Sequence, residues 1–122
     1  MPHESGNVNA SLEARILIRL LNGTGIKCLV DTGFTGALVL PRSFITRNGL
    51  AIVGREMFRT VDHHEINADI ALAEIEWLGE RQTLRAIVSE TDEAMIGTEM
   101  LIGTVLTIDY DAASVTITKS KS

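Results

Sequence analysis

The residue whose setting most strongly indicates chemistry is Asp31, which follows the apolar residues 28–30 and precedes Thr32-Gly33. A strand there would deliver a carboxylate directly into a turn, and Gly36 adds another glycine shortly afterwards. An aspartate in such a turn can simply accept a hydrogen bond from the backbone two residues further on, which is an Asx-turn. A carboxylate can also act as a general acid or base. The segment alone leaves both interpretations open.

A second short motif, Met95-Ile96-Gly97, consists of two apolar residues and a glycine, and a helical turn is predicted after it over residues 98–101. The retropepsin-like aspartic proteases of clan AA are marked by two motifs in this order. The first is two apolar residues before Asp-Thr-Gly, and the second is two apolar residues before Gly and a short helix. The chain resembles this family from about Ala14 to Thr118. The continuation Phe34-Thr35-Gly36 is most similar to a prokaryotic branch with an Asp-Thr-Gly-Phe signature.

The resemblance implies an all-β fold, a retropepsin-like closed barrel or sandwich of short antiparallel strands with one or two short helices. Such a domain carries half of a two-fold active site. The resemblance makes Asp31 the catalytic residue and Thr32 the hydroxyl that locks two active-site loops together across a dimer. Gly33 would let the substrate backbone approach, and residues 95–97 would pack beneath the aspartate loop.

Peptide hydrolysis by this route needs two aspartates around one water, one ionised and one protonated. No other aspartate in the chain is followed by Thr-Gly or Ser-Gly, so the chain holds half of such a site; the others are Asp62, Asp69, Asp92, Asp109 and Asp111. A symmetric homodimer would bring Asp31 against its copy. The implied function is an aspartic endopeptidase acting on a peptide or protein substrate, with no metal or organic cofactor.

Two other functions are kept beside this one. The first is a catalytically silent dimeric module that has the same fold and groove but binds a peptide without cleaving it. The second is a domain in which Asp31 only forms a turn. The position of Asp31 between Val30 and Thr32-Gly33 favours the enzyme over the turn former, whereas the sequence does not separate the enzyme from the silent module.

The candidate substrate contacts are Phe34 and the pair His63-His64. Phe34 stands where most relatives have a small residue, and Thr35-Gly36 stands where retroviral members commonly carry acids. The histidines lie in the polar segment 62–65, a flap candidate without glycine. They do not predict a metal site, because adjacent residues on a strand point to opposite faces and cannot readily share one ion.

The elements that must position these residues are short and extended. Segments 14–21 and 26–30 are predicted to form a hairpin around Asn22-Gly23, since Asn-Gly adopts the positive φ angles of tight turns. A short helix is predicted over 41–48, ended by Gly49. Further strands are predicted over residues 56–61, 66–77, 83–88, 104–108 and 115–118. Short strands at this spacing indicate a closed or sandwiched antiparallel fold.

Length and composition indicate one globular domain. The chain has 122 residues, of which 45% are hydrophobic and 22% charged. The first eleven residues show no apolar period, so residues 1–11 are predicted as a flexible lead-in and 12–122 as the domain. The single cysteine, Cys28, has no base near it in sequence and is predicted to pack in the core.

The charge balance bears on partners and location. Eleven Lys and Arg against sixteen Asp and Glu give a net charge of −5, and the basic residues are scattered, which does not indicate nucleic-acid binding. No run approaches the ~20 apolar residues of a membrane span, and the N-terminal segment lacks the features of a signal peptide. The sequence therefore predicts a soluble cytoplasmic protein without nucleic-acid or membrane partners.

Overall fold

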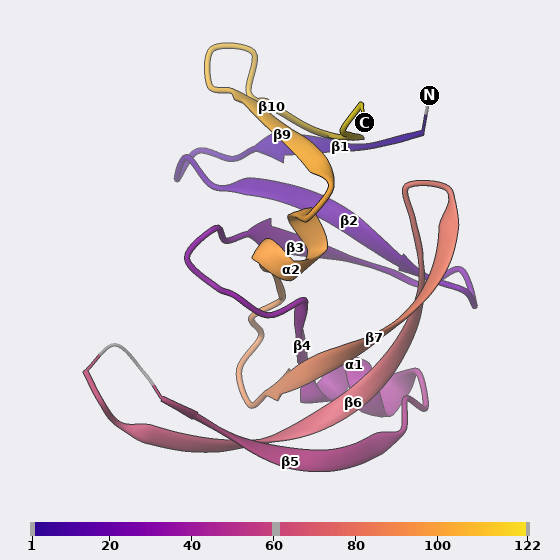
Figure 1. The fold of residues 1–122 in the computed structure, drawn as a ribbon, viewed down its shortest axis with the longest axis vertical. Coiled ribbons are helices and arrows are strands. Elements are labelled where there is room, and N and C mark those ends of the chain that lie inside the picture. The colour runs from indigo at the N-terminus through magenta and orange to yellow at the C-terminus, as the bar shows by residue number, and fades with distance from the viewer. Residues whose placement is uncertain (1, 60–61, 122) are drawn as a thin grey trace.

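Strands make up most of the chain in the computed structural model, which describes residues 2–59 and 62–121 (Figure 1). Their bounds are β1 (His3–Val8), β2 (Ala14–Leu20), β3 (Gly25–Val30), β4 (Leu38–Pro41), β5 (Ile52–Arg59), β6 (Glu65–Trp77), β7 (Glu80–Ser89), β8 (Met95–Ile96), β9 (Thr104–Asp109) and β10 (Ser114–Lys119). Two short helices are α1 (Arg42–Arg47) and α2 (Thr98–Leu101). Neither has the length and apolar character that a membrane-crossing helix needs.

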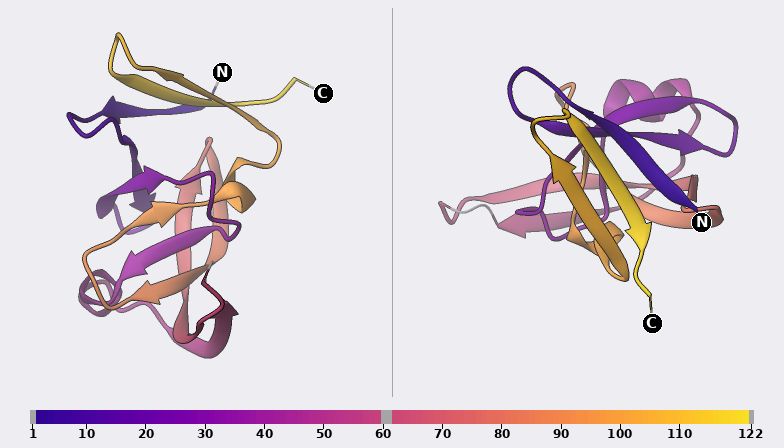
Figure 2. Two further views of the ribbon diagram at one scale, coloured as in Figure 1. Left: turned by 90° about the vertical axis from the view of Figure 1, so that its left-hand side faces the viewer. Right: turned by 90° about the horizontal axis from the view of Figure 1, so that it is seen from above.

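The strands pair into one sheet in the order β5-β6-β7-β4-β8-β3-β2-β1-β10-β9. A further pairing of β2 with β6, which places Leu20 opposite Ile75, closes the six strands β6-β7-β4-β8-β3-β2 into a barrel. Strands β1, β10 and β9 continue the sheet as a layer at one end of the molecule (Figure 2). The predicted all-β closed architecture is confirmed. The sheet is mixed rather than purely antiparallel, since β3 with β8 and β4 with β7 run parallel.

Alternation along the strands builds the core. On β2, Ala14, Ile16, Ile18 and Leu20 are buried while the residues between them are not, which is the period of a strand with one covered face. The helix α1 adds Phe44 and Ile45 to the same core. Cys28 is fully buried and Trp77 nearly so, which confirms the core position predicted for the cysteine.

The predicted hairpin between β2 and β3 is confirmed. Gly23 has a φ of 90°, and the side-chain oxygen of Asn22 accepts the backbone N–H of Thr24 at 2.8 Å. The predicted end of the first helix is also confirmed, with Gly49 at a φ of 63°. Strand β5 begins at Ile52 rather than at residue 56, and residues 60–61, which were predicted to continue it, lie outside the described residues.

The prediction of a flexible lead-in over residues 1–11 is wrong for His3–Val8. This segment is strand β1 and pairs with both β2 and β10. Its only large apolar residue is the buried Val8, so no apolar period marks the strand, and it is held through its backbone pairing. Gly6 fits closely, because an added Cβ would lie 1.9 Å from the carbonyl oxygen of Arg15.

Candidate active site

Asp31 lies immediately after β3, where the chain leaves the barrel for the loop 31–37 that leads into β4. Its carbonyl oxygen accepts the N–H of Phe34 at 3.1 Å, and its side-chain oxygen Oδ1 accepts the N–H of Gly33 at 2.9 Å. The Asx-turn of the simpler interpretation is therefore present. The carboxylate is half-buried, and its Oδ2 makes no hydrogen bond within the described part of the chain. The turn orients one oxygen and leaves the other open to a water or a substrate.

The second motif lies beneath this loop. Strand β8 runs between β3 and β4, parallel to β3 with Ile96 opposite Val30, and antiparallel to β4. The N–H of Asp31 donates to the carbonyl of Ile96 at 2.9 Å. Beyond β8, the N–H of Gly97 donates to Ala37 at 2.9 Å. The Asp31 loop is thus fixed from below at its start and at its end.

Gly97 is required at this place for steric reasons. A Cβ built on it would lie 2.3 Å from the carbonyl oxygen of Gly36 and 2.5 Å from that of Phe34. The N–H of the next residue, Thr98, donates to the carbonyl of Phe34 at 2.8 Å. These contacts are so close that any side chain at Gly97 would push the Asp31 loop outward.

Thr32 and Gly33 are both exposed at the tip of the loop. The hydroxyl of Thr32 has no hydrogen-bond partner among the residues that the structure describes in a single chain. An added Cβ at Gly33 would meet only Asp31 Oδ1, at 3.2 Å. The backbone of the loop next to the Asp31 carboxylate is therefore not covered by other parts of the described chain.

The three candidate substrate contacts fall in two places. Phe34 is half-buried and its ring covers two glycines, since a Cβ on Gly36 or on Gly97 would lie 2.5 Å from a ring atom. His63 and His64 are exposed at the end of the β5–β6 hairpin, which we call the flap, and His63 takes a positive φ of 65°. The flap tip and the loop after β3 lie on the same side of the molecule (Figure 1).

Sequence reasoning did not predict the pocket beside Asp31. A cavity of about 330 Å³, the Leu29 pocket, is lined by Glu13, Arg15, Leu29 and residues 91–95. Leu29 and Asp31 stand two residues apart, so their side chains lie on the same side of the chain. The position of Leu29 in the alternating pattern of β3, half-buried after the buried Cys28, is the signal that could have indicated it.

A second cavity of about 370 Å³, the Phe58 pocket, lies under the flap. It is lined by residues 36–38, Glu56, Phe58, Ile70, residues 83–85, Ile87 and Glu99. Glu56 and Phe58 line it from β5, and an ion pair joins Glu56 to Arg85 of β7. Residues 36 and 37 of the Asp31 loop thus line the Phe58 pocket beneath the flap, whereas the Leu29 pocket is reached through Leu29, two residues before Asp31.

Two pKa values in this region are shifted. Hydrogen bonds from Asn9 and Arg15 lower the pKa of Glu13 in the Leu29 pocket, so this carboxylate is ionised at neutral pH. Burial raises the pKa of the Cys28 thiol to about 12. Cys28, which lies three residues before Asp31 in the core, is therefore neutral and is not a nucleophile.

Solved structures similar to this chain include a retropepsin-like aspartic protease from Rickettsia conorii, with a TM-score of 0.63 and 17% identity over 94% of this chain and 89% of that one. The simian foamy virus (mac) protease matches with a TM-score of 0.54 and 17% identity over 72% and 91% of the two chains. A foamy viral protease-reverse transcriptase in complex with an RNA/DNA hybrid matches at 0.54 and 16%, with 80% of this chain covering 14% of that one.

No protein-family model and no curated protein matches the sequence. The structural similarity, at this low identity, concerns the fold. The chain has the retropepsin-like fold, as the resemblance of the two motifs predicted, and the structures named above that share it include a retropepsin-like aspartic protease and a viral protease.

Proposed function

We propose that the chain is one protomer of a homodimeric aspartic endopeptidase, in which the Asp31 carboxylates of two copies act on one water. The observation that carries this proposal is the loop itself. Asp31 stands at the open end of the barrel with one oxygen held by Gly33 N–H and the other without a partner among the described residues. Beneath it, β8 and Gly97 fix the backbone.

The second carboxylate must come from another copy. Among the other aspartates, Asp69 is already engaged by two arginines, and none of the rest stands in a Thr-Gly or Ser-Gly loop. Two Asp31 side chains across a two-fold axis share a single proton, because like charges about 3 Å apart do not both ionise. Thr32 of each loop, exposed and without a partner among the described residues of one chain, would then bond across the axis.

The chemistry follows from that shared proton. The ionised Asp31 takes a proton from the water as its oxygen attacks the peptide carbon, and the protonated Asp31 donates to the carbonyl oxygen. The tetrahedral gem-diol then breaks its C–N bond. The amide nitrogen leaves with the proton that the first Asp31 took from the water, and one gem-diol hydroxyl returns a proton to the second Asp31 as the carboxylic acid forms, which restores the shared proton. Exposed Gly33 leaves room for the substrate backbone, and Phe34, His63 and His64 are the proposed substrate contacts.

The test is digestion of a peptide library at pH values from acid to neutral by the wild type and by Asp31→Asn. The matched control is Asp111→Asn, because Asp111 is exposed in the turn between β9 and β10. We expect the wild type and the control to cleave, and Asp31→Asn to lose activity by on the order of 10³-fold or more. Equal cleavage by Asp31→Asn would exclude this role for Asp31. Peptide binding without cleavage by the wild type would instead establish the silent dimeric module.

A further inference from the structure

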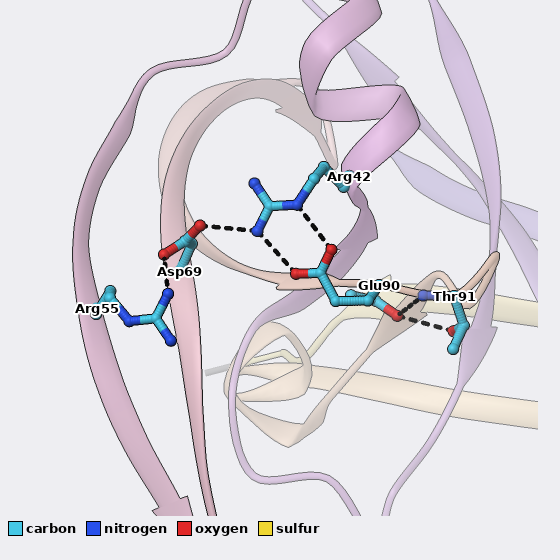
Figure 3. Close-up of polar contacts among 6 residues, drawn as sticks. Arg42, Arg55, Asp69, Glu90 and Thr91 are labelled. Carbon is cyan, nitrogen blue, oxygen red and sulfur yellow. Dashed lines mark hydrogen bonds and ion pairs between the residues drawn. The ribbon is translucent and has the colours of Figure 1, made fainter.

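A network of four charged side chains surrounds Arg42 at the start of α1 (Figure 3). The Nε and Nη2 atoms of Arg42 donate to the two carboxylate oxygens of Glu90, each at 2.7 Å. Nη2 also donates to Oδ2 of Asp69 at 2.7 Å. The other oxygen of Asp69 accepts from Arg55 at 2.8 Å. One guanidinium therefore holds two carboxylates at once.

The two carboxylates belong to different walls of the proposed peptide cleft, by which we mean the Leu29 pocket, the Asp31 loop and the Phe58 pocket taken together. Asp69 is on β6 of the flap, directly opposite Arg55 of β5. Glu90 follows the last residue of β7 and begins the loop 90–94, of which residues 91–94 line the Leu29 pocket. Arg42 thus connects the flap to a wall of the pocket beside Asp31.

The network stands where these two walls separate. The pairing of β6 with β7 ends at Ile70 opposite Ile87. Beyond that pair β6 is paired only with β5, and β7 passes Ser89 into the loop 90–94. No sheet hydrogen bond in the described residues therefore fixes the flap relative to the loop past this fork. The Arg42 side chain spans it from α1.

Hydrogen bonds within the loop 90–94 hold it together, so a shift of Glu90 also moves residues 91–94, which line the Leu29 pocket. The N–H of Thr91 donates to Ser89 Oγ at 3.1 Å, and the N–H of Glu93 donates to Thr91 Oγ1 at 3.2 Å. At its other end, the carbonyl of Ala94 accepts the N–H of Leu29 at 2.9 Å. Between these ties, the carboxylate of Glu90 gives the loop its contact with α1.

The charges of the network persist over a wide pH range. Hydrogen bonding by Arg42 lowers the pKa of Asp69 and also that of Glu90, so both are ionised at neutral and mildly acidic pH. The Asp69 side chain is only 17% exposed, which shields its contacts from salt more than those of Glu90 at 67%.

We propose that Arg42 is a positioning residue of the peptide site, which sets the flap and the loop 90–94 at a fixed separation and thereby shapes the cleft over Asp31. It acts through Asp69 and Glu90 and is not a catalytic residue. The inference rests on the proposed function in one respect, that the cleft binds an extended peptide. A planar guanidinium can bond both oxygens of Glu90 and still reach Asp69, whereas a lysine ammonium is a point charge without that fork.

The first test is amide hydrogen exchange on the full chain, which needs no activity. We expect Arg42→Met to raise exchange about tenfold in both residues 91–93 and the strands of the flap. Arg55→Met, which removes only the contact with Asp69, should raise it in the flap alone. Arg47→Met is the matched control, because Arg47 lies in the last turn of the same helix, exposed and without an ion pair among the described residues, and it should change neither segment.

The second test measures peptide affinity and kinetics. The probe is a reduced-amide peptide selected by binding to the wild type, so that it serves whether or not the protein cleaves. We expect Arg42→Met to weaken the affinity for this probe about tenfold. For a peptide that the wild type cleaves, the variant should raise KM by the same factor and leave kcat within about threefold, which is the signature of lost positioning before the chemical step. Arg42→Lys should be intermediate and decides the question if Arg42→Met does not fold.

An affinity of Arg42→Met and Arg42→Lys equal to that of Arg47→Met would overturn the role of Arg42, as would an exchange change confined to α1. A wild type that binds the peptide without cleaving it, with the tenfold effect intact, would remove the endopeptidase proposal and keep the positioning role. A wild type that binds no peptide would overturn both.

Discussion

Replacement of Gly97 by alanine tests the steric argument for the Asp31 loop. The added Cβ would lie 2.3 Å from the carbonyl oxygen of Gly36 and 2.5 Å from both the carbonyl oxygen and ring atom Cδ2 of Phe34. Real Cβ atoms essentially never approach closer than 3.0 Å. Because two of the three atoms are backbone, no change of rotamer relieves the contact, and the loop over Gly97 must move outward by about 0.7 Å.

The expected cost has a thermodynamic and a functional part. Overpacking of a close-packed site typically costs ~1–3 kcal/mol, and the two backbone contacts put Gly97→Ala at the upper end, about 3 kcal/mol. A displacement of a catalytic group by about 1 Å can reduce the rate on the order of 10²-fold, so peptidase activity should fall by a comparable factor even where the variant is folded.

The matched control is Gly54→Ala on β5, where an added Cβ meets no atom within 4 Å and the φ is not positive. Denaturant unfolding of both variants should show a change within ~0.5 kcal/mol for Gly54→Ala. Equal stability of the two variants, with equal activity, would refute the view that Gly97 is required by the closeness of the Asp31 loop.

Three further perturbations address the dimer and the core. Thr32→Val should weaken self-association and Thr32→Ser should preserve it, because valine leaves buried partners unsatisfied at ~1–3 kcal/mol each; sedimentation equilibrium measures both, and undiminished association of Thr32→Val would remove the role of the hydroxyl. Asp31→Asn should leave the dimer as stable as the wild type or more so, since it relieves repulsion between two close carboxylates; a lower melting temperature than that of Asp111→Asn would contradict this. Cys28, with a pKa raised to about 12 by burial, should resist iodoacetamide at neutral pH until the chain is unfolded. Because the folded pKa lies above the ordinary value of 9.0, the stability it contributes is complete below that pH and is lost as the pH rises toward 12, a dependence that Cys28→Ala should lack.

Local signals account for what the sequence predicted correctly. The Asn22-Gly23 turn and the alternation of β2 are visible within a few residues, and so is the strand that ends just before Asp31. The loop-supporting role of residues 95–97 came from the family resemblance, and the pairing of β8 with β3 agrees with it.

Other features carry no local signal. All four residues of β4 are buried, so the strand has no alternation, and β1 has a single buried apolar residue and is held by its backbone pairing. The network around Arg42 unites Asp69 and Glu90, which are far apart in sequence and have no shared spacing or motif. Such a cluster depends on the parallel pairing of β4 with β7, which only the fold reveals.

The insertion of β8 between β3 and β4 also sets an order of events in folding. Strands β3 and β4 are close in sequence, yet each is paired with β8 and not with the other. Before residues 95–97 arrive, nothing supports the loop that bears Asp31, so this loop closes through a long-range contact whose formation is entropically slow. During synthesis from the N-terminus, a chain that has not yet reached residues 95–97 contains Asp31 but lacks the strand β8 that supports its loop. We therefore expect the site to assemble in a late step of folding, with no formed cleft on the nascent chain before then.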